Sequence, residues 1–217
     1  MFVSFRRRVG AHSCVISLRG FTARAAGVLN PYFLEIIMNR TEHVRLMAEY
    51  NEWMNAKLYE AARSLPDDEL SADRKAFFGS ILGSLNHLVV ADTIWLKRFS
   101  THPANYPALL AIRDLPAPAS LDQILFADIQ GLSRHRALLD QMIREWAGSI
   151  SEPDLDCVLG YSNTKGIAAR RNFYALVVHF FNHQTHHRGQ VTTLLSQAGV
   201  DVGVTDLLML IPDETQA

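Results

Sequence analysis

The stretch RNFYALVVHFFNHQTHHRGQVTTLLSQAG, residues 171–199, decides the fold class of this chain. Its apolar side chains recur at helical spacing and mark one inner face. These residues are Leu176, Phe180, Val191, Leu194 and Ala198. Gly199 directly follows the last of them and is a natural C-terminal stop. We therefore predict a long amphipathic helix over about residues 171–197.

Three upstream segments have the same periodicity and predict three more long helices. A proline-rich connection over residues 101–119 separates the second of these helices from the third. Four long amphipathic helices favour an all-α fold, a four-helix bundle. The three upstream helices are expected over about residues 41–64 with Thr41 as N-cap, over about residues 77–99, and from a cap at Ser120 to about Trp146.

Two shorter segments complete this part of the chain. Residues 157–159 and 166–168 flank the turn-forming tetrapeptide SNTK, residues 162–165. This pattern predicts a small β-hairpin inserted before the last long helix. The apolar run LLMLI, residues 207–211, is expected to pack on the bundle.

The composition excludes several classes of protein. Of the 217 residues, 48% are hydrophobic and 20% are charged, which is typical of a globular chain with a sizeable core. Two cysteines are too few for a disulfide scaffold or a zinc site made of thiolates. No apolar run reaches the roughly 18–20 residues of a membrane-spanning helix, so no membrane partner is expected.

The charge is unevenly distributed along the chain. Residues 38–217 contain 16 Lys and Arg against 21 Asp and Glu, so this part is acidic. Proteins that bind duplex nucleic acid cluster basic residues because neutralisation of phosphates supplies most of the affinity. We therefore expect no nucleic-acid partner for residues 38–217.

Residues 1–37 form a segment of different composition. They contain five arginines and one acidic residue, Glu35. We expect a basic, disordered N-terminal extension here and a bundle domain over residues 38–217. Three interpretations stay open: an organelle transit peptide, a basic tail for an acidic partner, and translated sequence upstream of a working start at Met38.

A cluster of histidines lies in the last predicted helix. Positions i and i+4 share one helix face, so His183 and His187 project side by side, and so do His179 and His183. Two imidazoles on an apolar face are unfavourable without a shared partner, because their nitrogens lose water and their charged forms repel. A divalent metal resolves this conflict, since neutral imidazole is a common metal ligand. The spacing therefore predicts a metal site that includes His183.

A third ligand has to come from another helix, and His87 is the best candidate. It lies in the middle of the second predicted helix, near the small residues Gly83, Ser84 and Ala91. His43 and His135 are alternatives, although both are expected to face solvent. The chain has no HExxH, Glu-x-x-His, GxSxG or GxGxxG motif, so metalloprotease, di-iron, α/β-hydrolase and dinucleotide-binding sites are not supported.

Two sequence motifs resemble a known family. Residues 182–191, NHQTHHRGQV, look like the C-terminal signature of the DinB (damage-inducible) family in the DinB/YfiT-like superfamily. Residues 85–96, LNHLVVADTIWL, resemble its second-helix motif. The resemblance covers about residues 38–212. It implies an up-down-down-up bundle, often dimeric, with a divalent metal on His87, His183 and His187.

The resemblance also bears on function. Three histidines leave coordination positions open, which is typical of catalytic metal sites. Some relatives in the superfamily are transferases that use low-molecular-weight thiols such as mycothiol or bacillithiol. We expect one Ni²⁺, Zn²⁺, Mn²⁺ or Fe²⁺ ion in a cytoplasmic homodimer that acts on a small molecule as a thiol-dependent S-transferase or a hydrolase. The alternative is a non-catalytic metal-binding stress-response bundle that acts through dimerisation.

Three further polar residues lie close to the expected ligands in the sequence. Asp92 has two interpretations, an acceptor that orients a ligand histidine or a buried partner of an arginine. Asn86 faces either the pocket or solvent. Arg188 is expected in a salt bridge at the surface or at an interface, and the alternative is that it binds an anionic substrate.

Overall fold

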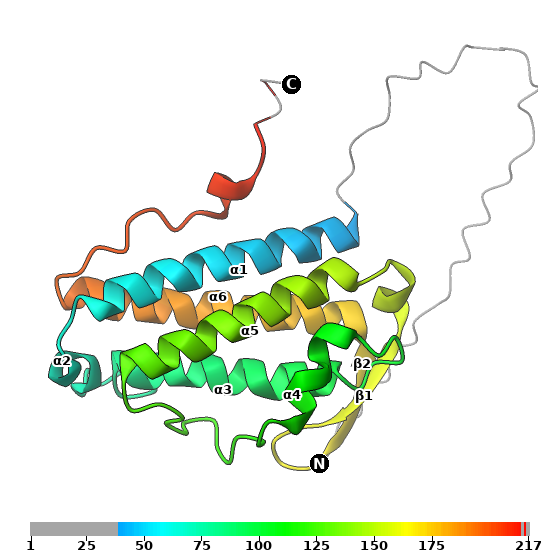
Figure 1. The fold of residues 1–217 in the computed structure, drawn as a ribbon, viewed down its shortest axis with the longest axis horizontal. Coiled ribbons are helices and arrows are strands. Elements are labelled where there is room, and N and C mark those ends of the chain that lie inside the picture. The colour runs from blue at the N-terminus through cyan, green and yellow to red at the C-terminus, as the bar shows by residue number, and fades with distance from the viewer. Residues whose placement is uncertain (1–38, 214, 216–217) are drawn as a thin grey trace, which may run out of the picture. The chain divides into compact units, whose positions relative to one another are not determined.

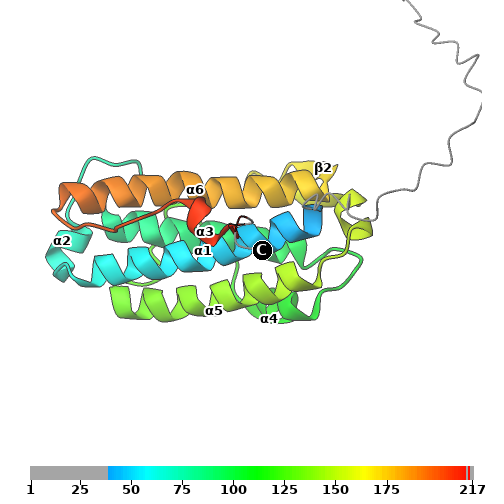
Figure 2. The same ribbon diagram turned by 90° about the horizontal axis from the view of Figure 1, so that it is seen from above.

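The computed structural model describes residues 39–213 and 215, so the expectations for residues 1–37 lie outside the described residues. Four long helices lie side by side (Figures 1 and 2). α1 packs against α5 and α6, and α3 packs against the same two helices from the other side. The helices are α1 (Arg40–Arg63), α3 (Ile81–Phe99), α5 (Ile129–Ser149) and α6 (Phe173–Gln197).

The directions of the four helices define the topology of the bundle. α1 and α6 run one way and α3 and α5 run the other way (Figure 1). This is the up-down-down-up order, and the prediction of an all-α bundle is confirmed. None of the described helices is long and apolar enough to cross a membrane.

The N-terminus of α1 differs from the prediction by two residues. Asn39, not Thr41, is the N-cap. The Asn39 side chain accepts a hydrogen bond from the Glu42 backbone at 2.8 Å, and Glu42 accepts one from the Asn39 backbone at 2.9 Å. This reciprocal pair satisfies two backbone donors, which fixes where the helix begins. A short helix that the sequence analysis did not predict, α2 (Asp67–Ser71), follows α1.

The predicted starts of the two middle helices were too early. α3 begins at Ile81, where the Ser80 hydroxyl accepts a hydrogen bond from the Gly83 backbone at 2.9 Å. α5 begins at Ile129, capped by Asp128, and not after Ser120. Residues 119–128, which we name the strap, lack helical structure. A helix that started after Ser120 was expected to bury Leu121 and Ile124 on its apolar face, but they are 45% and 52% exposed.

The connection between α3 and α5 and the insert before α6 contain short elements. The connection forms η1 (Pro107–Leu109) and α4 (Leu110–Asp114), and η2 (Pro153–Asp156) precedes the insert. The insert is an antiparallel hairpin of β1 (Val158–Ser162) and β2 (Ala168–Asn172), as predicted, with longer strands. Asn172 ends β2 and caps α6 by accepting from the Ala175 backbone at 3.0 Å, so the hairpin is joined directly to the helix that carries the histidines.

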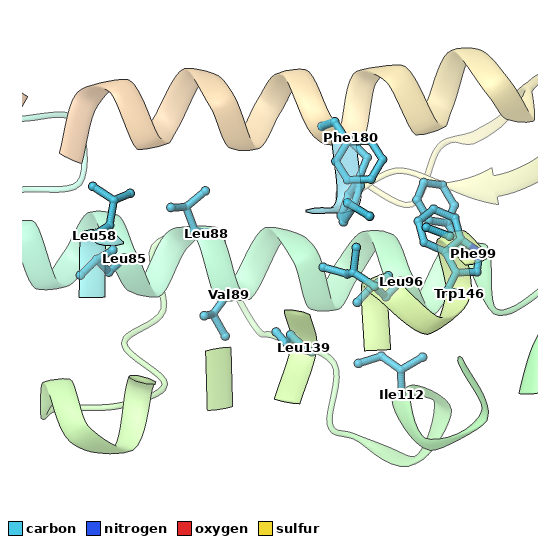
Figure 3. Close-up of a cluster of buried hydrophobic side chains, with 14 of the residues drawn as sticks. Leu58, Leu85, Leu88, Val89, Leu96, Phe99, Ile112, Leu139, Trp146 and Phe180 are labelled. Carbon is cyan, nitrogen blue, oxygen red and sulfur yellow. The ribbon is translucent and has the colours of Figure 1, made fainter. Parts of the chain in front are cut away.

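Apolar side chains from all four long helices fill the interior. Figure 3 shows this core, in which Phe99 stacks on Trp146 with ring centroids 5.1 Å apart. The C-terminal segment forms η3 (Leu207–Leu210), and the Tyr50 hydroxyl donates to the Thr205 carbonyl at 2.7 Å. The expected packing of residues 207–211 is not seen for most of the run, because Leu208, Met209 and Ile211 are 43–72% exposed.

Candidate metal centre

Three histidines from two helices converge on one point. His87 comes from α3, and His183 and His187 come from successive turns of α6. Each offers a ring nitrogen, and these atoms all lie within 4.8 Å of one another. The Nε2 atoms of His87 and His187 are 3.3 Å apart. The structure thus brings together the three residues named in the sequence analysis.

The other candidate histidines lie outside this group. His179 is exposed and packs against Trp95 with ring centroids 5.1 Å apart. Of the two histidine pairs with i,i+4 spacing, the group therefore contains His183 with His187 and not His179 with His183. The His43 Nδ1 atom lies 3.1 Å from the Tyr174 hydroxyl. His135 was expected to face solvent but is half-buried against Phe126.

Hydrogen bonds fix the tautomers of two of the three histidines. The Nδ1–H of His87 donates to the Leu121 carbonyl at 2.8 Å, and that of His187 donates to Gln190 Oε1 at 2.8 Å. A carbonyl oxygen can only accept, so in each ring the proton is on Nδ1 and the lone pair is on Nε2. Such second partners commonly orient histidines that ligate a metal.

The charge state and spacing of these nitrogens fit a divalent metal. Burial lowers the pKa of His87 to about 4 and that of His183 to about 3, so both are neutral at pH 7. Two lone pairs that face each other cannot form a hydrogen bond. Two nitrogens bound to one tetrahedral ion at about 2.0–2.1 Å are about 3.3 Å apart, which is the separation of the His87 and His187 nitrogens.

Phe78 and the strap shield the histidines on one side. The Phe78 ring stacks on His87 with centroids 3.7 Å apart and lies edge-on to His187 at 5.6 Å. Leu121, whose carbonyl orients His87, belongs to the strap. Residues far apart in the sequence thus hold the ring of one candidate ligand.

Asn86 anchors the strap and faces neither the pocket nor solvent. It is fully buried, and its Oδ1 accepts hydrogen bonds from the backbones of Leu125 and Phe126 at 2.8 and 3.0 Å. Its Nδ2 donates to the carbonyls of Leu82 and Phe126, both at 3.0 Å. Three of these four hydrogen bonds reach the strap and fix it to the helix that carries His87, whereas the bond to Leu82 stays within that helix. This function could not be predicted from the sequence, since the only local signal was an asparagine next to a histidine.

Replacing Asn86 by alanine is expected to destabilise the fold by about 1–3 kcal/mol, because two partly buried backbone donors lose their acceptor. Urea denaturation measures this, and limited proteolysis should show new cleavage within residues 119–128. Asn182→Ala is the matched control, because Asn182 is an exposed asparagine on α6. Equal denaturation midpoints for the two variants would contradict the anchoring function of Asn86.

A pocket of about 240 Å³ opens beside the histidines. His87 and His183 line one end, and Ala91, one turn along α3, is small enough to leave the space open. The hairpin residue Tyr161 forms part of the far wall. Within residues 39–213 and 215, no fourth His, Cys, Asp or Glu joins the three histidines. A ligand position beside them is therefore accessible to a small molecule.

Asp92 is a buried partner of an arginine, and the alternative that it orients a ligand histidine was wrong. It is 1% exposed and forms an ion pair with Arg136. It also accepts a hydrogen bond from Gln184 Nε2 at 2.7 Å. Arg136 makes a second ion pair with Asp140 at 3.0 Å. Gln184 directly follows His183, so this polar core is connected to the helix that carries the candidate ligands.

The prediction for Arg188 was also wrong, since it forms no salt bridge at the surface of the described chain. It is 2% exposed and donates to Asn51 Oδ1, to Gln184 Oε1 at 3.3 Å and to Thr185 Oγ1 at 3.2 Å. Burial lowers its pKa to about 10. The sequence around Arg188 does not indicate this burial. Its hydrogen-bond partners are Gln184 and Thr185 in the preceding turn of α6 and Asn51 on α1.

The fold and the site together define a class, a four-helix bundle with three histidines that could hold a metal ion next to a small pocket. Comparison with known proteins identifies the family. The sequence model described as "DinB family" matches residues 38–216, and the chain belongs to this family. "Protein DinB" of Bacillus subtilis (strain 168) is 24% identical over 160 residues, which cover 73% of this chain and 87% of that protein. No solved structure matches the chain at a significant level.

Proposed function

We propose that this protein binds one divalent metal ion through His87, His183 and His187 and is a metal-dependent enzyme of the thiol S-transferase or hydrolase type. The observation that carries the proposal is the group of three histidine nitrogens, which has no fourth protein ligand among the described residues and lies next to a pocket. Catalytic sites keep a position open, whereas structural sites close all four.

The chain's own residues prepare this site for a metal. The Leu121 carbonyl and the Gln190 side chain hold two of the imidazoles in the tautomer that offers Nε2. Phe78 covers the His87 ring and excludes water from that side. When bound, the metal would lower the pKa of a water or thiol ligand, or polarise a carbonyl group. Imidazole donors suit Ni²⁺, Zn²⁺ and Fe²⁺ and accept Mn²⁺, so all four are candidates.

The substrate in this proposal is a small molecule, because the pocket has a volume of only about 240 Å³. A low-molecular-weight thiol as co-substrate and a homodimeric assembly are part of the proposal through the resemblance to the DinB family. Size-exclusion chromatography with light scattering tests the dimer, and thiol-transfer assays with a panel of thiols test the co-substrate.

The open ligand position distinguishes an enzyme from a purely structural metal site. We expect the Co²⁺-loaded protein to change its visible absorption saturably when azide or mercaptoethanol is added, because an exogenous ligand can enter the coordination sphere. An unchanged spectrum would mean that the sphere is closed. This result would contradict the enzymatic proposal and favour a non-catalytic metal-binding bundle.

A further inference from the structure

Arg98 lies on the same face of α3 as His87, at the other end of the pocket. The two residues are eleven positions apart, which is close to three whole helical turns and about 16 Å along the axis. Ala91 and Trp95 occupy the turns between them, and all four residues line the pocket. A molecule in this pocket can therefore touch the histidines and Arg98 at once.

Two aromatic rings hold the guanidinium group of Arg98. It lies over Trp95 at 4.6 Å and over Tyr161 at 5.0 Å from the ring centroids. Tyr161 comes from the hairpin, so both the hairpin and α3 fix the orientation of the group. Contacts of this kind use the faces of the guanidinium plane and leave the N–H groups at its edge available.

The charge of Arg98 has no partner within residues 39–213 and 215. In this part of the chain its side chain makes no hydrogen bond and no ion pair, although it is half-buried. Arg40, Arg74 and Arg136 each pair with at least one carboxylate. Burial lowers the pKa of Arg98, which is the expected effect on a cation without a counter-charge.

The surroundings favour an anion from outside the protein. Among the described residues, no Asp or Glu lines this pocket or the adjoining pocket of about 390 Å³ that shares Arg98. Lys97 is engaged elsewhere, because its Nζ donates to the carbonyls of Ile112, Arg113 and Leu115 at 2.6–3.0 Å. Arg98 is thus the cation that the pocket offers to a ligand.

We propose that Arg98 binds a carboxylate group of the substrate. The edge of a guanidinium group presents two parallel N–H donors that match the two oxygens of a carboxylate. Side chains on one helix lean toward the same end, so the two groups are separated mainly by the rise of about 16 Å along the axis, less the longer reach of the arginine. The site then takes an elongated small molecule with a metal-binding group at one end and a carboxylate at the other. The part of this inference that concerns the metal-binding group of the substrate rests on the proposed function, and the part that concerns the carboxylate at Arg98 does not.

The Arg98 end can be tested in metal-free protein. We expect hexanoate to bind about 10-fold more tightly than hexanol. Calorimetry and tryptophan fluorescence measure the binding, since Trp95 lines the pocket. Arg98→Gln should remove this preference, and Arg98→Lys should retain part of it. Arg134→Gln is the matched control, because Arg134 is an exposed arginine on α5. Equal binding of hexanoate and hexanol to the wild type, or an unchanged preference in Arg98→Gln, would overturn the proposal.

Metal-loaded protein tests both ends together. Mercaptohexanoate should bind to the wild type about 10-fold more tightly than mercaptohexanol does. The two ligands should bind to Arg98→Gln with equal affinity, and the metal content of this variant should be unchanged. If the wild type bound no metal, this would contradict the proposed function alone, because the preference for hexanoate is measured in metal-free protein. Tighter binding of hexyl phosphate than of hexanoate would overturn the assignment to carboxylates.

Discussion

Replacing His183 by alanine is expected to reduce the metal content from about one equivalent per chain to background. The variant loses one of three nitrogen donors, and no fourth metal-ligating side chain in the described part of the chain can replace it. Loss of a hydrogen bond to a ligand already costs about 10–100-fold in affinity, so loss of the ligand itself should cost more. Elemental analysis of protein purified without a histidine tag measures this.

His179→Ala is the matched control for this experiment. His179 lies one turn before His183 on the same helix, but it is exposed and outside the histidine group. The control variant should retain the full metal content of the wild type. Metal retention in His183→Ala would refute the ligand set, and equal loss in both variants would show that the register along α6 is wrong.

The histidine pair could be predicted because its spacing is a local property of one helix. His183 and His187 are four residues apart on α6, and a helix brings such positions together whatever surrounds it. Spacing alone could not decide between this pair and His179 with His183. The position of His87 on α3 decides it, because His87 meets His187 and not His179.

The start of α5 could not be predicted in this way. Leu121, Ile124 and Leu125 have helical spacing, yet their segment is held in a non-helical conformation by Asn86, whose hydrogen bonds reach 39 and 40 residues along the chain. Local periodicity contains no information about such a partner. The same holds for the orientation of His87, which depends on a carbonyl group 34 residues away.

Burial of charged residues was the other property that the sequence did not reveal. The pattern around Arg188 resembles that of an exposed helix position, but Asn51 and Gln184 supply hydrogen bonds inside the bundle. A buried cation is tolerated only where such partners exist. Prediction from sequence therefore identified the apolar core and the histidine group more reliably than the polar core that connects the helices.

Replacing Asp92 by asparagine is expected to destabilise the fold by about 3 kcal/mol, because it leaves the charge of Arg136 buried with one partner fewer. Burial raises the pKa of Asp92, whereas Arg136 and Gln184 act against this by stabilising the carboxylate. The remaining ion pair between Arg136 and Asp140, at 3.0 Å, places the cost at the lower end of the usual range of about 3–5 kcal/mol. Urea denaturation of the metal-free protein measures the change.

Asp92 also controls the rotation of α6 relative to α3. Gln184 donates to Asp92 at 2.7 Å and accepts from Arg188 at 3.3 Å, so its amide is held at both ends. His183 precedes Gln184 directly, and His187 lies three residues beyond it. A rotation of α6 that broke these bonds would move both histidines away from His87. The Asp92→Asn variant is therefore expected to bind the metal more weakly as well as to unfold more easily.

A double-mutant cycle separates the ion pair from a general loss of packing. Asp92→Asn combined with Arg136→Met should cost at least about 1 kcal/mol less than the sum of the two single changes, because neither Asp92 nor Arg136 is then left as an unpaired charge. The loss of the Arg136–Asp140 pair is common to Arg136→Met and the double variant, so it cancels in the cycle. Asp73→Asn is the exposed control, since the Asp73–Lys75 pair lies at the surface and should not affect the denaturation midpoint. Strictly additive costs would mean that the pair contributes through packing alone. The rotation of α6 would then have to be fixed by the apolar contacts of the core.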